Sequence, residues 1–444
     1  MVRVFSNGSA TELYVRSVRD LLAYGKEVRP RGKLVKELRP VTFCFEVPQH
    51  KVTFVKGRLI NPFFQLAEAL WIISGRSDVK FLELFNKNMK QFSDDGVNFN
   101  APYGERIRFF GKNNAHGQII NPIDQLEDAF LTLQDDKDSR QAVIVIRDPA
   151  YDNYSYLKEE KGKDVACNLV ITAKIRDEKL DFHVFNRSND VHWGLFGANL
   201  CQFATLQELL ASWLGVEVGT YYHTTDSLHT YMDDYGASNT KCFTKLLETK
   251  DSEVDWCLHS PELYFRNEPQ IKTTREQTDW FLRFFWGCFA GYLFDEKVIN
   301  KEAAEVFHVF VVSSCKEGLR DSEGKTLDVD FSYWILTVDA MIAYALIRQK
   351  REKEALDFII KRVPSSNWKM SMLYFLYHKY TNTAVLNPEA VIEAIETIKK
   401  AVEELKQDLF IPETQHSGDE ELDEKRLNMA KAFIDRFFDF PNKN

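Results

Sequence analysis

The sequence predicts an α+β fold over residues 1–272, with a mixed sheet and packed helices, followed by an all-α region over residues 273–444. Three patterns lead to this division. Two alternating apolar runs, 168–175 and 180–186, surround a charged break and predict a β-hairpin. Apolar residues recur at helical spacing over 10–25 and over 198–214. Beyond about residue 275, one helical pattern follows another.

The other elements of the first region alternate between helices and strands. Asn61 and Pro62 should open a helix that runs to about residue 74, because Asn caps helices well and Pro suits the first turn. We also expect strands over 41–47 and 216–223, a buried strand over 142–146, and helices over 78–92 and 122–134. In the second region we expect helices over 279–294, 301–316, 331–349, 352–363, 367–380, 388–408 and 421–437.

Composition limits the class of protein. The content of 44% hydrophobic and 28% charged residues is that of a soluble globular protein, and a net charge of -9 argues against broad binding of nucleic acid or anionic membranes. Seven scattered cysteines without a CxxC pair suggest neither a metal site nor a disulfide framework. The N-terminus lacks the apolar core of a signal peptide, and the apolar run 284–294 is too short to span a bilayer. We expect a cytoplasmic protein.

The hairpin places a cysteine beside an arginine. Paired residue numbers in an antiparallel hairpin have a nearly constant sum: Arg176 with Lys179 gives 355, and Cys167 with Arg187 gives 354. Cys167 and Arg187 should therefore lie opposite each other within a one-residue slip. A guanidinium favours the thiolate, which is the nucleophilic form. The alternative is a buried structural cysteine, but the arginine and the polar cluster downstream favour a nucleophile.

This stretch resembles the thymidylate synthase family, which includes the pyrimidine nucleotide hydroxymethylases. In that family a nucleophilic Cys is followed, twenty residues on, by Arg-Ser-x-Asp, and here Cys167 is followed by Arg187-Ser188-Asn189-Asp190. The match continues through Gly194, Asn199 and His229-x-Tyr231, and it extends from about residue 10 to about residue 270. It implies a thymidylate synthase-like catalytic domain over 1–272 and leaves the role of a domain over 273–444 open.

The resemblance assigns residues around the pyrimidine base. Glu68, in a Glu-x-x-Trp pattern with Trp71, would organise water and proton transfer, and Trp71 would belong to the cofactor site. Tyr103 would lie beside the base and the folate, and Asp190 would contact the pterin. Asn199 would read the base, although its alignment needs one extra residue in LFGAN. From the residues alone, two alternatives remain open: Glu68 could lie on the solvent-facing side of its helix, and Asn199 could be a helix cap.

The resemblance also assigns the phosphate and sugar contacts. Arg31, Arg187 and Ser188 would bind the phosphate, and His229 with Tyr231 would hold the deoxyribose 3′-hydroxyl. Arg140 would reach the phosphate of a partner subunit, which implies a homodimer; the second arginine usual there is Gln141 in this chain. Without the resemblance, Arg31 and Arg140 would read as charged turns on the surface.

The implied reaction is one-carbon transfer from 5,10-methylenetetrahydrofolate to C5 of a pyrimidine nucleoside monophosphate, after Cys167 adds to C6. The Asn199 amide suits uracil, and therefore dUMP, but would suit cytosine when flipped. The chain has no tryptophan between Trp71 and Trp193, no recognisable closing tail, and Asn168 where methylating enzymes commonly have His. These departures suggest a wetter site, which favours a hydroxymethyl product over reductive methylation to dTMP. An inactive synthase-like scaffold that binds a protein partner is the alternative from another class.

Overall fold

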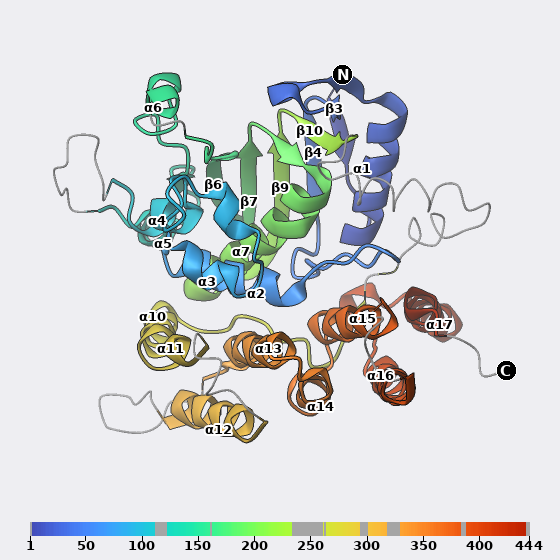
Figure 1. Cartoon of the computed structure of the whole chain (residues 1–444). Helices are drawn as coiled ribbons and strands as arrows, with labels where there is room; N and C mark the ends of the chain where they lie inside the picture. Colours follow the sequence, from blue (N-terminus) through green and yellow to red (C-terminus); the bar gives the residue numbers. More distant parts are fainter. Residues whose placement is uncertain are drawn as a thin grey trace. The chain divides into compact units, whose positions relative to one another are not determined.

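The computed structural model describes residues 2–111, 122–159, 162–232, 261, 263–293, 301–317, 329–382 and 388–440 (Figure 1). They form two compact units, each assembled from separate stretches of the chain. The sheet unit comprises Met1–Gly8, Leu13–Lys51 and Phe64–Lys241, and the helical unit comprises Ser9–Glu12, Val52–Phe63 and Cys242–Asn444. The boundary at residue 272 expected from the sequence stays a prediction.

Two β-sheets form the frame of the sheet unit. The six-stranded sheet has the order β1-β4-β9-β7-β6-β5, from β1 (Arg3–Phe5), β4 (Val41–Phe45), β9 (Glu217–Thr225), β7 (Lys179–Asn186), β6 (Asn168–Arg176) and β5 (Val143–Val145). It is mixed, because β1 pairs with β4 and β7 pairs with β9 in parallel, whereas the other pairs are antiparallel. The four-stranded sheet has the order β2-β3-β10-β8, from β2 (Lys26–Val28), β3 (Val35–Leu38), β10 (Leu228–Tyr231) and β8 (Asn189–Asp190).

The hairpin of β6 and β7 has the predicted register. Arg176 pairs with Lys179, and Asn168 pairs with Asn186 after a bulge between residues 168 and 170. Beyond the last pair, the Arg187 N–H donates to the Cys167 carbonyl oxygen at 3.0 Å. The bulge accounts for the one-residue slip, since an extra residue on one strand shifts all later pairs by one. The opposition of Cys167 and Arg187 is confirmed.

Helices pack around this frame (Figure 1). They are α1 (Ala10–Tyr24), α2 (Pro62–Ile73), α3 (Val79–Glu83), α4 (Tyr103–Arg108), α5 (Gln125–Asp135), α6 (Tyr154–Glu159) and α7 (Leu200–Leu214), with the short turns η1 (Pro30–Gly32) and η2 (Met89–Phe92) and the π-helix η3 (Val191–Asn199). Helix α7 lies against β7 and β9 and is buried along nearly its whole length, so it forms the centre of the core. The predicted α+β fold is confirmed.

Three expectations about single elements are wrong. The helix expected over 78–92 is split into α3 and η2, because the Asn86 side chain accepts from the Asn88 N–H at 3.1 Å and favours a turn. Strand β5 is an edge strand, with Val143 38% and Val145 39% exposed, and is not buried on both faces. The helix expected from residue 198 begins at Val191, as η3, and continues as α7.

The helical unit follows the predicted pattern closely. Its elements are α10 (Arg275–Phe284), η4 (Phe285–Phe289), α11 (Ala290–Leu293), α12 (Lys301–Glu317), α13 (Ser332–Arg348), α14 (Glu352–Arg362), α15 (Asn367–Asn382), α16 (Pro388–Gln407), η5 (Glu413–Gln415) and α17 (Glu420–Phe438). From α12 to α16, successive helices pack against each other, as short connections favour.

Residues 52–63 complete the helical unit, although they lie far from it in sequence. The Phe54 ring centroid is 5.4 Å from that of Phe437, and the Phe63 ring centroid is 5.2 Å from that of Tyr344. The Gly57 N–H donates to Tyr374 Oη at 3.0 Å. This segment therefore belongs to the core of the helical unit.

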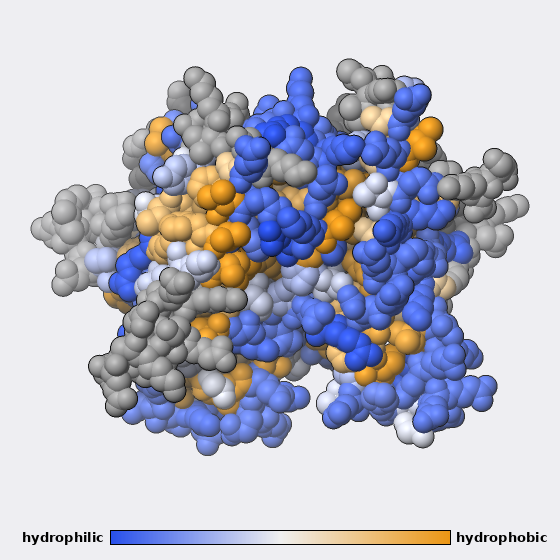
Figure 2. All heavy atoms as spheres, turned by 90° about the horizontal axis from the view of Figure 1, so that it is seen from below, coloured by the Kyte–Doolittle hydropathy of each residue, from blue (hydrophilic) through white to orange (hydrophobic). Residues whose placement is uncertain are grey.

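Some large apolar side chains of the helical unit remain exposed, among them Tyr292 on α11 and Val306, Val309 and Phe310 on α12. Figure 2 shows one face of the molecule, on which apolar areas are interrupted by hydrophilic ones. Within the described ranges, no helix combines the length and the apolar character that crossing a bilayer requires.

Candidate active site

Cys167 and Arg187 lie side by side where β6 begins and β7 has ended. The guanidinium is held by the carbonyl oxygens of Ala166, 2.9 Å from Nε, and Val165, 3.1 Å from Nη2, and Nη2 is 3.6 Å from Cys167 Sγ. The thiol keeps part of its surface open to solvent. This arrangement matches the interpretation of Cys167 as a nucleophile beside a cation.

The pKa of Cys167 is set by opposing effects. Burial raises the pKa of the thiol and outweighs the guanidinium of Arg187, which lowers it. Arg31, in η1, also lowers this pKa, so two cations act on the sulfur electrostatically. The expected effect of Arg187, which favours the thiolate, is present, but burial acts against it, and the sequence shows the cation without the desolvation.

Tyr103 covers the backbone of the nucleophile. It begins α4, and its Oη accepts from the Cys167 N–H at 3.4 Å. Burial raises the Tyr103 pKa above its ordinary value, and the negative charge of an ionised Cys167 raises it further, so the phenol keeps its proton. Gly104 allows α4 to approach α2, because a Cβ there would lie 2.6 Å from the Ile72 carbonyl oxygen.

Glu68 is buried on α2, with 8% of its surface exposed. Burial raises the pKa of its carboxyl to about 7, and a hydrogen bond from Gln202 lowers it in part. Its Oε2 is buried without a hydrogen-bond partner among the described residues. The solvent-stripe interpretation is therefore excluded. A carboxyl that titrates near neutral pH is suited to proton transfer.

Asn199 is not a helix cap. Its φ of -64° and ψ of -38° are helical, and it joins η3 to α7 without a capping hydrogen bond. The cap is Asp190, whose carboxylate accepts from the Trp193 N–H at the start of η3. A π-helix has a wider turn that holds an extra residue, which agrees with the insertion that the alignment of LFGAN required.

A chain of buried carboxamides surrounds Asn199. Asn168 Nδ2 donates to Asn186 Oδ1 at 2.7 Å, and Asn186 Nδ2 donates to Asn199 Oδ1 at 3.3 Å. Asn189 Nδ2 donates to the same oxygen at 3.0 Å, and Asn199 Nδ2 donates to Gln202 Oε1 at 2.9 Å. Sequence reasoning did not assign roles to Asn186, Asn189 or Gln202. Only Gln202 carried a signal in the sequence, because a polar side chain within the apolar run of α7 indicates a buried hydrogen-bonding partner.

The residues expected at the sugar and the pterin come together across the four-stranded sheet. Strand β10 pairs in parallel with β8, and His229 lies opposite Asp190. The His229 and Tyr231 rings meet edge to face with centroids 5.3 Å apart. Ser188, Asp190 and the His-Tyr pair are all half-buried, so each can still contact a ligand.

Two predicted residues are placed differently. Trp71 is 4% exposed and its Nε1 donates to the Asp78 carbonyl oxygen at 3.1 Å, so only a small edge of the ring is open. Arg140 is exposed and precedes β5, at the end of the hairpin where Arg176 Nη2 donates to the Asp138 carbonyl oxygen. This end is about 26 Å from the start of β6, at about 3.3 Å per residue. Both roles stay predictions.

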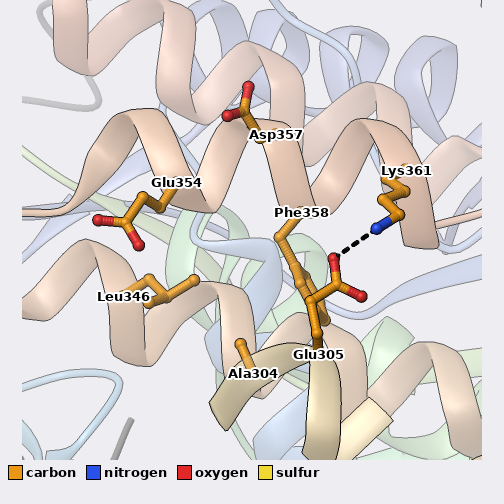
Figure 3. A pocket seen from close by; sticks show the side chains of 7 residues that line it. All are labelled: Ala304, Glu305, Leu346, Glu354, Asp357, Phe358 and Lys361. Atoms are coloured by element: carbon orange, nitrogen blue, oxygen red, sulfur yellow. Dashed lines mark hydrogen bonds and ion pairs between the residues drawn. The ribbon is translucent and has the colours of Figure 1, made fainter. Parts of the chain in front are cut away.

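The helical unit holds a hollow of about 100 Å³ between α12, α13 and α14 (Figure 3). Pockets for small molecules usually measure about 300–1,000 Å³. The Glu305 carboxylate at its edge is paired with Lys361 at 2.9 Å, and no predicted site residue lines the hollow. We assign it no ligand. Among the described residues, no group of His, Cys, Asp and Glu side chains is arranged to hold a metal ion.

The chain belongs to the thymidylate synthase family. A sequence model of that family, described as "Thymidylate synthase", matches residues 12–253. The chain is 42% identical over 380 residues to the deoxyuridylate hydroxymethyltransferase of Bacillus phage SP01, a match that covers 85% of this chain and 94% of the relative. Enzymes of the same name from Pseudomonas phage M6 and Delftia phage PhiW-14 are 37% identical over 195 residues and 35% identical over 212 residues. These two matches cover 43% and 46% of this chain, and 51% and 55% of the relatives.

The match to the SP01 enzyme reaches well beyond the family region. A match that covers 85% of 444 residues cannot be contained within residues 12–253. It must therefore include a large part of the helical unit. Much of the sequence of the helical unit is therefore shared with the SP01 enzyme.

Proposed function

We propose that the protein is a deoxyuridylate hydroxymethyltransferase, which replaces the hydrogen at C5 of dUMP by a hydroxymethyl group. The observation that carries the proposal is the 42% identity to the SP01 enzyme over 94% of that enzyme's length. The position of Cys167 next to Arg187 supports it, because this chemistry needs a nucleophile held beside a cation.

Cys167 would add to C6 of the uracil ring, which makes C5 nucleophilic. Negative charge would then develop on O4, and the Asn199 N–H group would stabilise it. Glu68, with its pKa of about 7, would exchange protons with the ring through water, and Tyr103 would hold the backbone beside the sulfur. Arg31, Arg187 and Ser188 would bind the phosphate, and His229 and Tyr231 the 3′-hydroxyl.

The residues near Asp190 fit a flat folate ring. Trp193 is 44% exposed, and its ring centroid is 5.4 Å from that of Phe64, so it presents an aromatic face beside a carboxylate. When bound, 5,10-methylenetetrahydrofolate supplies a one-carbon unit at the oxidation level of formaldehyde. Asp190 and Trp193 would hold it, and the role predicted for Trp71 would be limited to its exposed edge.

Product analysis tests this function. With 5,10-methylenetetrahydrofolate and dUMP, mass spectrometry should detect 5-hydroxymethyl-dUMP, and no dihydrofolate should form, because the folate is not oxidised. Cys167→Ala should abolish release of tritium from C5-labelled dUMP, whereas Cys44→Ser, at a half-buried thiol on β4, should not. Formation of dTMP with dihydrofolate would instead show a methylating enzyme. If tritium is released from neither dUMP nor dCMP, the remaining hypothesis is an inactive synthase-like scaffold that binds a protein partner.

We also propose a homodimer in which Arg140 of one copy binds the phosphate held by the other. Its distance from Cys167 in the same chain supports this arrangement, because one side chain cannot span about 26 Å. Mixing inactive Arg140→Ala and Cys167→Ala proteins, after dissociation and reassociation, should restore part of the activity. No recovery, although mixed dimers form, would contradict the shared site.

A further inference from the structure

Asn189 occupies the unspecified position of the Arg-Ser-x-Asp segment. It lies in β8 and is 3% exposed. Its Nδ2 is 3.0 Å from Asn199 Oδ1 and 3.1 Å from His223 Nε2. A carboxamide nitrogen carries two N–H groups, so these two contacts use both, and both partners must accept.

His223 is the second acceptor for the Asn189 carboxamide. The ring lies in β9 and is fully buried, and burial lowers its pKa to about 3, so it is neutral with one N–H. With Nε2 accepting from Asn189, the N–H is on Nδ1 and donates to Tyr221 Oη at 2.7 Å. Turning Asn189 over would require the opposite tautomer, with the N–H on Nε2 and Tyr221 Oη donating to Nδ1.

With its oxygen occupied, Asn199 can offer a ligand only an N–H donor. Its Oδ1 accepts from Asn189 and Asn186, and a carbonyl oxygen has two lone pairs, so its acceptor capacity is used. One N–H donates to Gln202 Oε1, and Gln202 donates in turn to the carboxyl of Glu68. Within the described part of the chain, no acceptor is found for the second N–H of Asn199, so it can donate to a ligand.

We propose that Asn189 is a positioning residue for specificity: by holding Asn199 Oδ1, it makes the site donate to ring position 4 of the pyrimidine. The inference rests on the proposed function, in which Asn199 reads the base. Uracil carries an acceptor oxygen at position 4, whereas cytosine carries an amino group that donates. Turning Asn199 to suit cytosine would set its N–H groups against those of Asn189 and Asn186, so the site selects dUMP over dCMP.

The cost of keeping Asn189 supports a purpose beyond packing. Its Oδ1 is buried without a hydrogen-bond partner among the described residues. A buried unpaired acceptor is destabilising, and an apolar side chain of similar size would avoid that cost. The oxygen faces η3, where a Cβ at Gly194 would lie 2.8 Å from it.

The test is Asn189→Asp, which keeps the shape of the side chain but removes its N–H groups. The introduced carboxylate can only accept, so Asn199 should turn its N–H groups toward it and present Oδ1 to the base. The ratio of kcat/KM for dUMP to that for dCMP should fall by at least about tenfold, since sites that pair with a polar group discriminate strongly. In ¹⁵N spectra, the His223 N–H should move from Nδ1 to Nε2. Asn153→Asp is the matched control, because Asn153 Nδ2 also donates twice, to the carbonyl oxygens of Pro149 and Ala150.

The outcomes separate this inference from the function on which it rests. A purely structural role of Asn189 would lower both kcat/KM values together, and an unchanged ratio in the folded variant would overturn the inference. If the variant does not turn over, equilibrium binding of dUMP and dCMP supplies the ratio. If wild type releases no tritium from dUMP, the proposed function fails, but selective binding of dUMP that is lost in Asn189→Asp would still support the inference. Equal binding of both nucleotides by wild type would overturn it.

Discussion

The buried carboxyl of Glu68 should make the free protein less stable as the pH rises. Burial raises its pKa from 4.5 to about 7. The folded state therefore holds the proton more tightly than the unfolded state does, and the free energy of unfolding falls with rising pH between these two values. Glu68→Gln removes the titration and keeps the shape of the side chain.

The size of the effect follows from the shift. The difference between about 7 and 4.5 is about 2.5 units, and each unit corresponds to about 1.36 kcal/mol, which gives about 3 kcal/mol. Below about pH 4.5, Glu68 is protonated in both states and the wild type loses no stability. Above about pH 7, Glu68 is ionised in both states, and the free energy of unfolding is lower by the full amount. Glu68→Gln should therefore stabilise the protein by about 3 kcal/mol more at pH 8 than at pH 4.5.

Urea denaturation of both proteins at these two pH values checks the prediction. Glu217→Gln on β9 is the control, because the Glu217 side chain is 77% exposed, and its pH dependence should match that of wild type. Under the proposed function, Glu68→Gln should also lower kcat, since it removes the group proposed to exchange protons. An equal effect of Glu68→Gln on stability at both pH values would refute the reasoning.

Three further predictions concern packing and charge. Lys51→Met removes the ammonium group that lies 2.6 Å from the buried Glu208 carboxylate. In urea titrations, the free energy of unfolding should fall by about 3–5 kcal/mol. Adding Glu208→Leu should restore most of this loss. Arg187→Gln removes a cation that lowers the Cys167 pKa, so the pH midpoint of Cys167 alkylation should rise; an unchanged midpoint would contradict the assigned cause. Gly104→Ala forces a methyl group against the backbone of α2 and should cost about 1–3 kcal/mol, seen as a lower Tm.

Local patterns in the sequence were sufficient for much of the fold. β6 and β7 adjoin in the chain, so the position of the turn determines which residues pair, and the bulge altered the sum by only one. The C-terminal helices were predicted because each carries its own apolar periodicity. The elements that failed depend on neighbours: β5 looked buried because its sequence is apolar, but its place in the sheet is at the edge.

The site was predictable where one motif spans it and unpredictable where several elements meet. Cys167 and Arg187 follow from a hairpin register, but the raised pKa of the thiol depends on how much protein surrounds it. The contacts of Asn199 come from β7, β8 and α7, and no single stretch reveals that Asn186, Asn189 and Gln202 converge on it. A helix cap at Asn199 remained open from the residues alone, because the π-helical turn before it is not visible in hydrophobic spacing.

The placement of residues 52–63 has a consequence for how this architecture can be inherited. Phe54 and Phe63 pack in the helical unit, whereas the chain on either side of the segment, up to Lys51 and from Phe64, belongs to the sheet unit. A gene fusion that appended or trimmed only the carboxy-terminal half would leave two phenylalanines without their packing partners. Loss of the carboxy-terminal helices would therefore require changes in residues 52–63 at the same time, so the two parts of the chain should be inherited together.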